Sequence, residues 1–274
     1  MGQERCVHRG RGRWLAGQLA VVIVGVAAYF GVRGLTESAP RTAVRHGRQI
    51  LGLEKRLGLD WEGSAQSLVV GSNTLQTLAN WIYIWGHWPV IITALVWLAV
   101  RHRATYLRLR NAMVASGLVG IAIFTTYPVA PPRLAGLGFV DTITEQSASY
   151  RVLQPPAFVN QYAAMPSLHV GWDLLVGLAV ASAASAVWLR WLARTMPVLM
   201  ALSVVATANH YILDVFAGAA VGLLGLAVAR AIDASRAPAQ HVEDTVAPAV
   251  VRLPEQRTSP DAADTARRNS TAQK

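Results

Sequence analysis

Six apolar stretches that are nearly free of charge constrain the fold of this chain more than any other feature. Five contain no Asp, Glu, Lys or Arg, and the remaining one, residues 166–189, contains only Asp173. A helix of about 20 apolar residues spans the roughly 30 Å hydrocarbon core of a bilayer. We therefore predict an all-α, polytopic membrane helix bundle with six transmembrane helices, at residues 15–32, 75–100, 111–132, 166–189, 195–209 and 215–229.

The positions of the basic residues predict the orientation of these spans. Arginines gather before the first span, between the second and third, between the fourth and fifth, and after the sixth. These segments lie on one side of a six-span chain, and the positive-inside rule assigns that side to the cytoplasm. We predict a multi-pass protein of the cell membrane with both termini cytoplasmic. The net charge of +10 then meets anionic lipid head groups at the cytoplasmic face, and nucleic acid is not an expected partner.

The two ends of the chain differ in composition from the spans. Residues 1–14 form a basic cytoplasmic arm, and residues 233–274 have the polar, Ala- and Pro-rich composition of a disordered cytoplasmic tail. A cleaved signal peptide is the competing interpretation of the first apolar stretch. We favour a retained helix because the stretch is long for a signal and Arg33 follows it. Cys6 is the single cysteine, which excludes an intramolecular disulfide.

Residues 33–74 connect the first two spans on the outer side and begin with an amphipathic pattern. At 100° per residue, five cations fall within an arc of about 100° and four apolar residues lie opposite. This pattern predicts a helix lying in the membrane interface. We prefer an interfacial spacer with a solvated basic face to a substrate-binding role. The cations are Arg41, Arg45, Arg48, Lys55 and Arg56, and the apolar residues are Ala43, Ile50, Leu53 and Leu57.

Two histidines stand at the edges of apolar stretches, where an ionisable side chain is costly and is therefore a functional candidate. His210 is followed four residues later by Asp214. This spacing places both side chains on one helical face. The carboxylate can accept from one ring nitrogen and leave the other free to act as a nucleophile. A purely structural His–Asp pair explains the spacing equally well.

The second histidine, His169, closes the sequence Pro166-Ser167-Leu168-His169. Proline suits the first turn of a helix, so the amides that follow it would be unpaired donors able to bind phosphate, with the Ser167 hydroxyl beside them. His169 can then act as the general acid, although histidines are also common at membrane interfaces. Asp173 either helps to keep His169 protonated or, as we prefer, faces a polar cavity.

The segment from residue 127 to 165 is a long outer loop that leads into this element. Loops of this length inside compact proteins are usually functional or disordered, and the predicted topology brings this loop, His169 and His210 to one membrane face. Arg133 can clamp a phosphate or act only as an interfacial anchor, and Tyr127 and Arg151 are weaker candidates for phosphate binding. For His87, within the second span, we prefer a structural role to a catalytic one. No grouping of His, Cys and carboxylate predicts a metal, and we expect no cofactor.

These motifs resemble those of the type 2 phosphatidate phosphatase superfamily, which are KxxxxxxRP, PSGH and SRxxxxxHxxxD. Arg133 matches the first motif, residues 166–169 match the second, and Ser203, His210 and Asp214 match the third. The sequences at 127–133 and 165–169 are more similar to the inositolphosphotransferase-like branch, which includes the inositol phosphorylceramide synthases. The resemblance covers residues 40–230.

The resemblance implies a membrane enzyme in which the residues have distinct roles. His210 would be the nucleophile, His169 the acid, and Arg133, Ser167 and Ser203 would hold the phosphate of a lipid substrate. Residues 15–232 would form the six-helix catalytic domain. Thr126 and Val204 occupy the places of two phosphate-binding cations, which favours a phosphodiester donor over a phosphomonoester.

The function that follows is a lipid phosphotransferase acting through a phosphohistidine at the outer face. It would transfer a phosphoryl-containing head group, such as inositol phosphate, between lipid and alcohol acceptors. A lipid phosphate phosphatase that uses water as the acceptor is the alternative. A transporter or an inactive scaffold that binds anions through the histidines is a third class, and the complete set of nucleophile, acid and arginine argues against it.

Overall fold

The computed structural model describes residues 40–143 and 160–250 and isolated positions in the first apolar stretch. The isolated positions are Trp14, Gly17, Gln18, Ala20, Val21, Val24, Gly25 and Ala27. The basic arm before Trp14, Arg151 and residues 251–274 lie outside the described residues. The chain divides into two units, Met1–Ala231 and Ile232–Lys274, and the candidate active site lies in the first.

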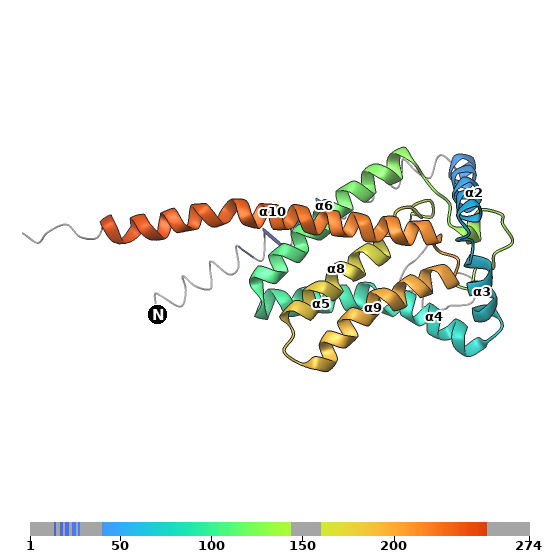
Figure 1. Ribbon diagram of the computed structural model, residues 1–274, viewed down its shortest axis with the longest axis horizontal. Helices are drawn as coiled ribbons and strands as arrows, with labels where there is room; N and C mark the ends of the chain where they lie inside the picture. Colours follow the sequence, from blue (N-terminus) through green and yellow to red (C-terminus); the bar gives the residue numbers. More distant parts are fainter. Residues whose placement is uncertain are drawn as a thin grey trace, which may run out of the picture. The chain divides into compact units, whose positions relative to one another are not determined.

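Within the described ranges the chain is helical, as predicted (Figure 1). An isolated parallel bridge between Val129 and Ala163 is the one strand-like pairing there. The elements in chain order are α2 (Pro40–Leu57), α3 (Glu62–Val70), α4 (Asn73–Trp85), α5 (Trp88–Arg101), α6 (Arg103–Thr126), the short 3-10 helix η1 (Pro132–Leu134), α8 (Leu168–Ala183), α9 (Val187–Ala206) and α10 (Ile212–Val250).

Several of these helices have the length and composition of membrane spans. The helices α6 and α9 and the segment Ile212–Arg236 of α10 are each long and apolar enough to cross a bilayer. The pair α4 and α5 makes a fourth span if it is taken as one helix bent by 40° at its break. These correspond to the second, third, fifth and sixth predicted spans. The fourth predicted span is the shorter apolar helix α8, and the first falls on residues that are described only at isolated positions.

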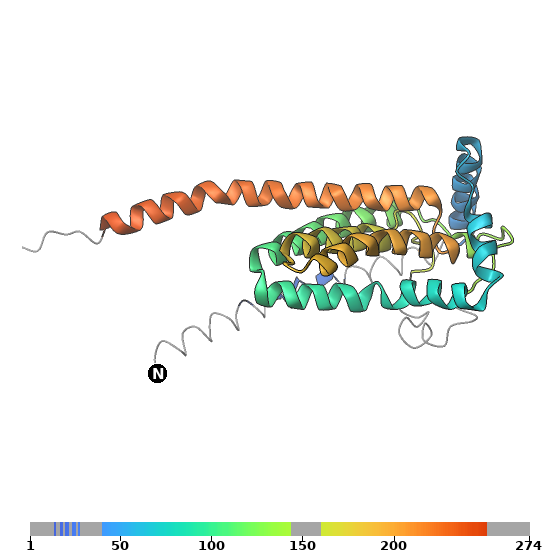
Figure 2. The same cartoon turned by 60° about the horizontal axis from the view of Figure 1, so that its bottom comes forward.

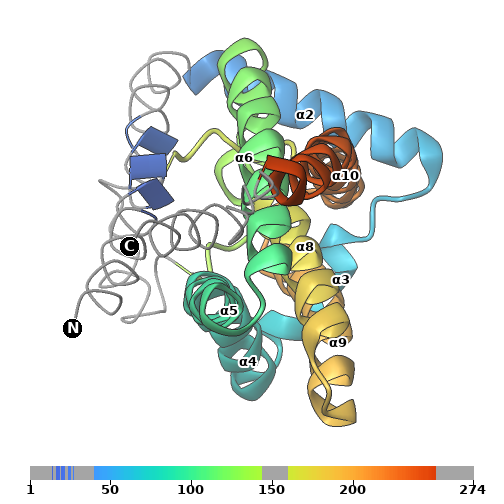
Figure 3. The same ribbon diagram turned by 90° about the vertical axis from the view of Figure 1, so that its left-hand side faces the viewer.

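Helix α8 lies at the centre of the bundle, where it contacts α5, α6 and α9 (Figure 3). Its apolar side chains, including Leu175 and Val176, share one buried cluster with Ile91 and Leu98 of α5 and Leu109 of α6. This apolar cluster therefore packs α5 and α6 against α8 and fixes the position of α8 along the bundle.

A seam of glycines brings α8 and α10 into backbone contact. A Cβ atom at Gly171 would stand 2.5 Å from the carbonyl oxygen of Gly218, and one at Gly222 would stand 2.8 Å from that of Gly171. Small residues allow membrane helices to approach this closely. The seam places Ser167, just before α8, against the first turn of α10, where the Ser167 amide donates to the Asp214 carbonyl at 3.0 Å.

Helix α2 runs across the end of the bundle at which α9 ends and α10 begins (Figure 2). The helix predicted from the basic pattern is thus present, but the prediction of its buried face was partly wrong. Leu53 and Leu57 are exposed, and the buried face contains Ala43, Gly47, Ile50, Leu51 and Glu54. The rotation brings Gly47 onto the bundle, where a Cβ would clash with the Tyr211 hydroxyl and the Ala130 carbonyl.

Helix α10 ends at Val250, within the range that we predicted as a tail. Residues 233–250 contain several alanines, the residue with the highest helix propensity, but also Pro238 and Pro248, which disfavour a helix interior. The boundary of the tail at residue 233 stays a prediction.

Candidate active site

The His210 side chain stands on a tight turn between α9 and α10. Helix α9 ends at Ala206, and Ala208 adopts a positive φ of 52°. The amides of Asn209 and His210 both donate to the Val204 carbonyl, at 2.9 and 3.1 Å. His210 therefore precedes α10, whereas the HxxxD spacing had suggested that it lies within a helix beside Asp214.

The ring of His210 is oriented chiefly by a backbone carbonyl. Its Nδ1 lies 2.7 Å from the Ala164 carbonyl oxygen and 3.5 Å from Asp214 Oδ2. Because a carbonyl can only accept, Nδ1 carries the hydrogen, and Nε2 of the neutral ring keeps its lone pair. Asp214 is fully buried and also accepts from the Tyr211 amide at 2.9 Å. The predicted His210–Asp214 pairing is present, with Ala164 as the nearer partner.

The second histidine faces the free nitrogen of the first. His169 Nδ1 lies 3.4 Å from His210 Nε2, so the two residues named from separate motifs meet at one place. The Tyr83 ring stacks against His169 with the centroids 4.8 Å apart. A general acid beside a nucleophile is the arrangement that transfer of a phosphoryl group requires.

A second His–Asp pair adjoins His169. His87 Nδ1 lies 2.8 Å from Asp173 Oδ1, both side chains are 3% exposed, and the His87 ring centroid is 4.4 Å from that of His169. His87 occupies the break between α4 and α5. Asp173 thus pairs with His87. It neither pairs with His169 nor faces an open cavity, the two alternatives considered from the sequence. Three imidazoles lie in a row between two buried carboxylates.

Ser167 is the N-cap of α8, so the helix starts after the proline rather than with it. Its hydroxyl accepts from the Val170 amide at 3.5 Å, and its own amide donates to Asp214. The first backbone bond of the helix is donated by Gly171 to the Ser167 carbonyl. The amides of Leu168 and His169 precede that bond and remain the helix-end donors expected for an anion, whereas the Ser167 amide is already used.

Arg133 is held beside the catalytic turn by two side chains. Its Nε donates to Asn209 Oδ1 at 2.9 Å, its Nη1 lies 2.6 Å from Asp141 Oδ2, and its amide donates to the Ala208 carbonyl at 3.1 Å. Asn209 is the neighbour of His210 in sequence. The structure therefore brings Arg133 to the site as predicted, with a carboxylate partner that offsets part of its charge.

Two other predicted phosphate-binding residues have different contacts. The Ser203 hydroxyl donates to the Ala79 carbonyl at 2.7 Å and ties α9 to α4, which is a structural role. Tyr127 ends α6 and stacks on His46, with ring centroids 3.9 Å apart. Neither side chain has a hydrogen bond or ring contact with His169 or His210 among the described residues, and their phosphate-binding role stays a prediction.

Two buried glutamates that sequence reasoning missed hold the start of α10. Glu54 of α2 accepts from the Leu213 amide at 2.7 Å, and Glu62 of α3 accepts from the Ile212 amide at 3.0 Å. Their oxygens satisfy backbone amides of the first turn of α10, which have no partner inside the helix. Burial and a hydrogen bond with Glu62 raise the pKa of Glu54 to about 9. The one available signal was an acidic residue on the apolar side of an amphipathic helix.

This pair predicts a pH-dependent stability. The pKa of Glu54 rises from 4.5 to about 9 on folding, so between these values the folded state binds a proton that the unfolded state lacks. Protonated Glu54 therefore stabilises the folded state fully below the unfolded-state pKa. This stabilisation is lost as the pH rises towards and through the folded-state pKa. Glu54→Gln keeps an oxygen for the Leu213 amide and cannot ionise. We expect the unfolding temperature of the wild type, relative to this variant, to fall between about pH 5 and about pH 9; a difference that is constant with pH would contradict this.

The comparisons with known proteins agree with this geometry. The family model of the PAP2 superfamily matches residues 48–228, a range that contains Arg133, His169, His210 and Asp214. The chain belongs to the PAP2 superfamily. This superfamily comprises phosphatases and phosphotransferases of membrane lipids, so the chain is a PAP2 enzyme, and the family resemblance read from the three motifs is confirmed.

Two individual proteins are similar to this PAP2 chain. The phosphoinositol dihydroceramide synthase of Bacteroides thetaiotaomicron is 29% identical over 144 residues, which are 46% of this chain and 46% of that protein. The chain thus aligns with a little under half the length of this curated relative. The crystal structure of Aquifex aeolicus LpxE has a TM-score of 0.44 and 14% identity, and the match covers 58% of this chain and 86% of that one.

Proposed function

We propose that this PAP2 enzyme transfers a phosphate-linked head group from a phosphodiester lipid to an alcohol through a phosphohistidine on His210. The observation that carries the proposal is the facing pair of rings. His210 Nε2 points at His169 Nδ1 while His210 Nδ1–H is held by the Ala164 carbonyl. A nucleophile with a fixed tautomer and an acid at its free nitrogen serve both halves of a double displacement.

In the first half of the reaction, His210 Nε2 attacks phosphorus. A P–N bond forms, the bond to the lipid alcohol breaks, and protonated His169 gives its proton to the departing oxygen. In the second half, an acceptor hydroxyl gives its proton to His169 and attacks phosphorus, the P–N bond breaks, and the lone pair of His210 returns. Arg133 and the amides of Leu168 and His169 hold the non-bridging oxygens and stabilise charge in both transition states.

The electrostatics of the site favour a diester. Arg133 shares its charge with Asp141, and Val204, which replaces a family cation, is fully buried in an apolar cluster with Tyr83, Ile84 and Met200. A phosphomonoester near neutral pH carries nearly two negative charges, whereas a diester carries one. The name of the Bacteroides relative makes inositol phosphate the first head group to test.

Head-group exchange measured against phosphate release tests this proposal. The purified chain in vesicles is given phosphatidylinositol labelled in its inositol phosphate together with ceramide or diacylglycerol, and separately phosphatidate. We expect label to move to the acceptor lipid faster than phosphate leaves phosphatidate. Faster hydrolysis of phosphatidate would make the chain a lipid phosphatase, and activity on neither lipid would contradict the proposed donors.

We also propose that the chain crosses the membrane six times, with both termini in the cytoplasm and the site at the outer face. The basis is the alternation of arginine-rich segments in the sequence. A cysteine placed at Val140, which is 38% exposed in the loop after Arg133, should react with an impermeant thiol reagent in intact cells. The native Cys6 is the internal control and should react only after permeabilisation. The opposite pattern would place the site on the cytoplasmic side.

A further inference from the structure

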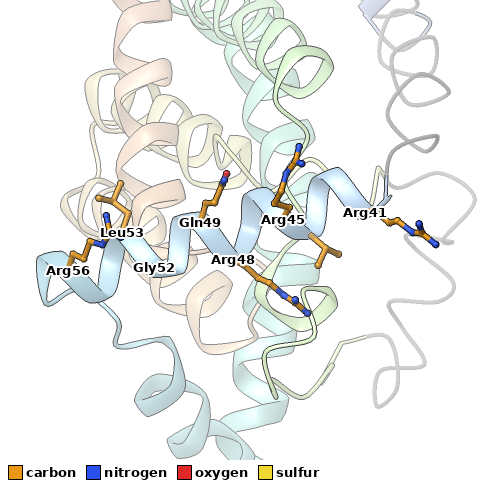
Figure 4. Close-up of a pocket in the computed structure, with 8 residues that line it drawn as sticks. Arg41, Arg45, Arg48, Gln49, Gly52, Leu53 and Arg56 are labelled. Atoms are coloured by element: carbon orange, nitrogen blue, oxygen red, sulfur yellow. The ribbon is translucent and has the colours of Figure 1, made fainter.

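An arginine-lined groove covers the side of α2 that faces away from the bundle. It is open, has a volume of about 550 Å³, and contains four guanidinium groups spread along the helix (Figure 4). The arginines are exposed, three on successive turns and Arg56 two turns further along. We call these residues, Arg41, Arg45, Arg48 and Arg56, the arginine face of α2.

No acidic side chain of α2 neutralises this face. Glu54 is the one acidic residue of the helix, and it is fully buried on the opposite side, where its carboxylate accepts from the Leu213 amide. Guanidinium groups bind phosphate oxygens bidentately and lose less hydration energy than ammonium groups. The face therefore suits an anion with phosphate chemistry.

Half-buried and exposed apolar residues stand beside the arginines. Val44 and Leu53 line the groove itself, and Leu57 and Trp61 follow at the end of the helix with 57% and 64% exposure. Tryptophan is enriched at the level of lipid head groups. Cations next to apolar side chains on a helix that lies across the ends of the spans fit the phosphate and the upper acyl region of a lipid, whereas a soluble anion would use only the cations.

The buried side of the same helix contacts the catalytic elements directly. The Ala43 carbonyl accepts from the Ala130 amide at 3.0 Å, and His46 Nδ1 lies 2.8 Å from the Pro128 carbonyl oxygen. Both partners belong to the loop that carries Arg133, and Glu54 joins α2 to the first turn of α10. One helix thus separates the arginine face from the candidate active site.

We propose that the arginine face of α2 binds the phosphodiester head groups of anionic phospholipids and holds donor lipids at the entrance to the catalytic site. The assignment of these lipids as donors rests on the proposed function; the binding itself does not. Thr126 and Val204 leave the candidate active site without two cations, and the arginine face of α2 supplies positive charge outside that site. There the charge attracts an anionic lipid but does not strengthen the binding of a dianionic monoester in the active site.

A charge-neutral variant and a matched control test the binding. The variant is Arg41→Gln, Arg45→Gln and Arg56→Gln, which spares Arg48 because its Nε donates to the Ala135 carbonyl at 3.1 Å. The control removes the same number of charges elsewhere, at Arg101, Arg190 and Arg194, none of which lines the groove. Both sets are placed in a full-length His210→Ala background, so turnover cannot consume the probe.

The probe is phosphatidylglycerol with a diazirine in its head group, at trace level in phosphatidylcholine nanodiscs. Photolysis and mass spectrometry quantify the label on residues 40–57. Since surface cations attract anionic lipid and guanidinium groups bind phosphate oxygens directly, we expect the triple variant to reduce this labelling by ~10-fold or more. The control should match the parent, and unlabelled phosphatidylglycerol should compete where phosphatidylcholine does not.

Equal labelling of the triple variant and its parent would overturn the proposal, as would equal competition by the zwitterionic lipid. Competition by soluble glycerophosphate at low concentration would also overturn it, because the occupant would then be a free phosphate. Labelling on α2 by a chain that exchanges no head groups would leave the binding site standing and remove only its role in catalysis. The two proposals therefore fail separately.

Discussion

Replacing His210 by glutamine is expected to reduce head-group transfer by roughly 10⁴-fold or more, since the covalent route is lost with the nucleophile. Glutamine retains an amide N–H that can reach the Ala164 carbonyl, so the turn between α9 and α10 should remain folded. The measurement is transfer of labelled head group by purified protein in vesicles. An unfolding temperature equal to that of the wild type is the control for folding.

The same experiment separates the nucleophile from its supporting carboxylate. Asp214→Asn should lose less activity than His210→Gln, because the Ala164 carbonyl continues to hold Nδ1–H and the asparagine oxygen can still accept from the Tyr211 amide. A head group labelled with radioactive phosphate should remain on the wild-type protein in an alkali-stable, acid-labile bond and be missing from His210→Gln. Turnover by His210→Gln at the wild-type rate would eliminate the mechanism.

The second large effect is expected at His169. His169→Gln should lower transfer from a natural lipid by about 10²- to 10⁴-fold, the usual contribution of a general acid. The loss arises because an alkoxide must then depart without a proton. A donor with a nitrophenol leaving group needs no protonation, so the variant should release nitrophenol from an aryl phosphodiester at nearly the wild-type rate in the first turnover, while later turnovers still need His169 as the base.

This dependence on the leaving group distinguishes an acid from a residue that only maintains the site. His210→Gln is the matched control and should be inactive on both donors, since both require the nucleophile. Equal losses of His169→Gln in the first turnover on the lipid and on the aryl diester would contradict the assignment. In that case His169 would act through packing against Tyr83 and His87, and another group would supply the proton.

Residues that stand alone in their local sequence could be singled out as candidates. His210, Asp214, His169 and Arg133 are titratable or charged residues beside long apolar stretches, and their cost in that setting made them functional candidates. The structure brings three elements more than 30 residues apart into one site, with His169 next to His210 and Arg133 next to Asn209. The all-helical fold followed from the same apolar stretches.

Residues that act through distant partners were not predicted. The Leu213 amide is 159 positions from the carboxylate of Glu54, and His87 is 86 positions from Asp173. No local periodicity records such pairs. The sequence places Ser203 and Val204 by motif spacing alone. In the structure the Ser203 hydroxyl donates to the Ala79 carbonyl, and Val204 is buried among apolar side chains, and neither contact can be read from the local sequence.

The sequence by itself determined that this chain is a helical membrane enzyme and marked two histidines and an arginine as candidates for phosphate chemistry, because hydropathy and the cost of buried charge act on each residue locally. Only the tertiary structure decided which atoms hold them. The Ala164 carbonyl selects the His210 tautomer, Glu54 and Glu62 cap α10, and Asp173 pairs with His87. Hydrogen bonds depend on distance and direction between segments that are remote in the chain, and these exist only after the helices have packed.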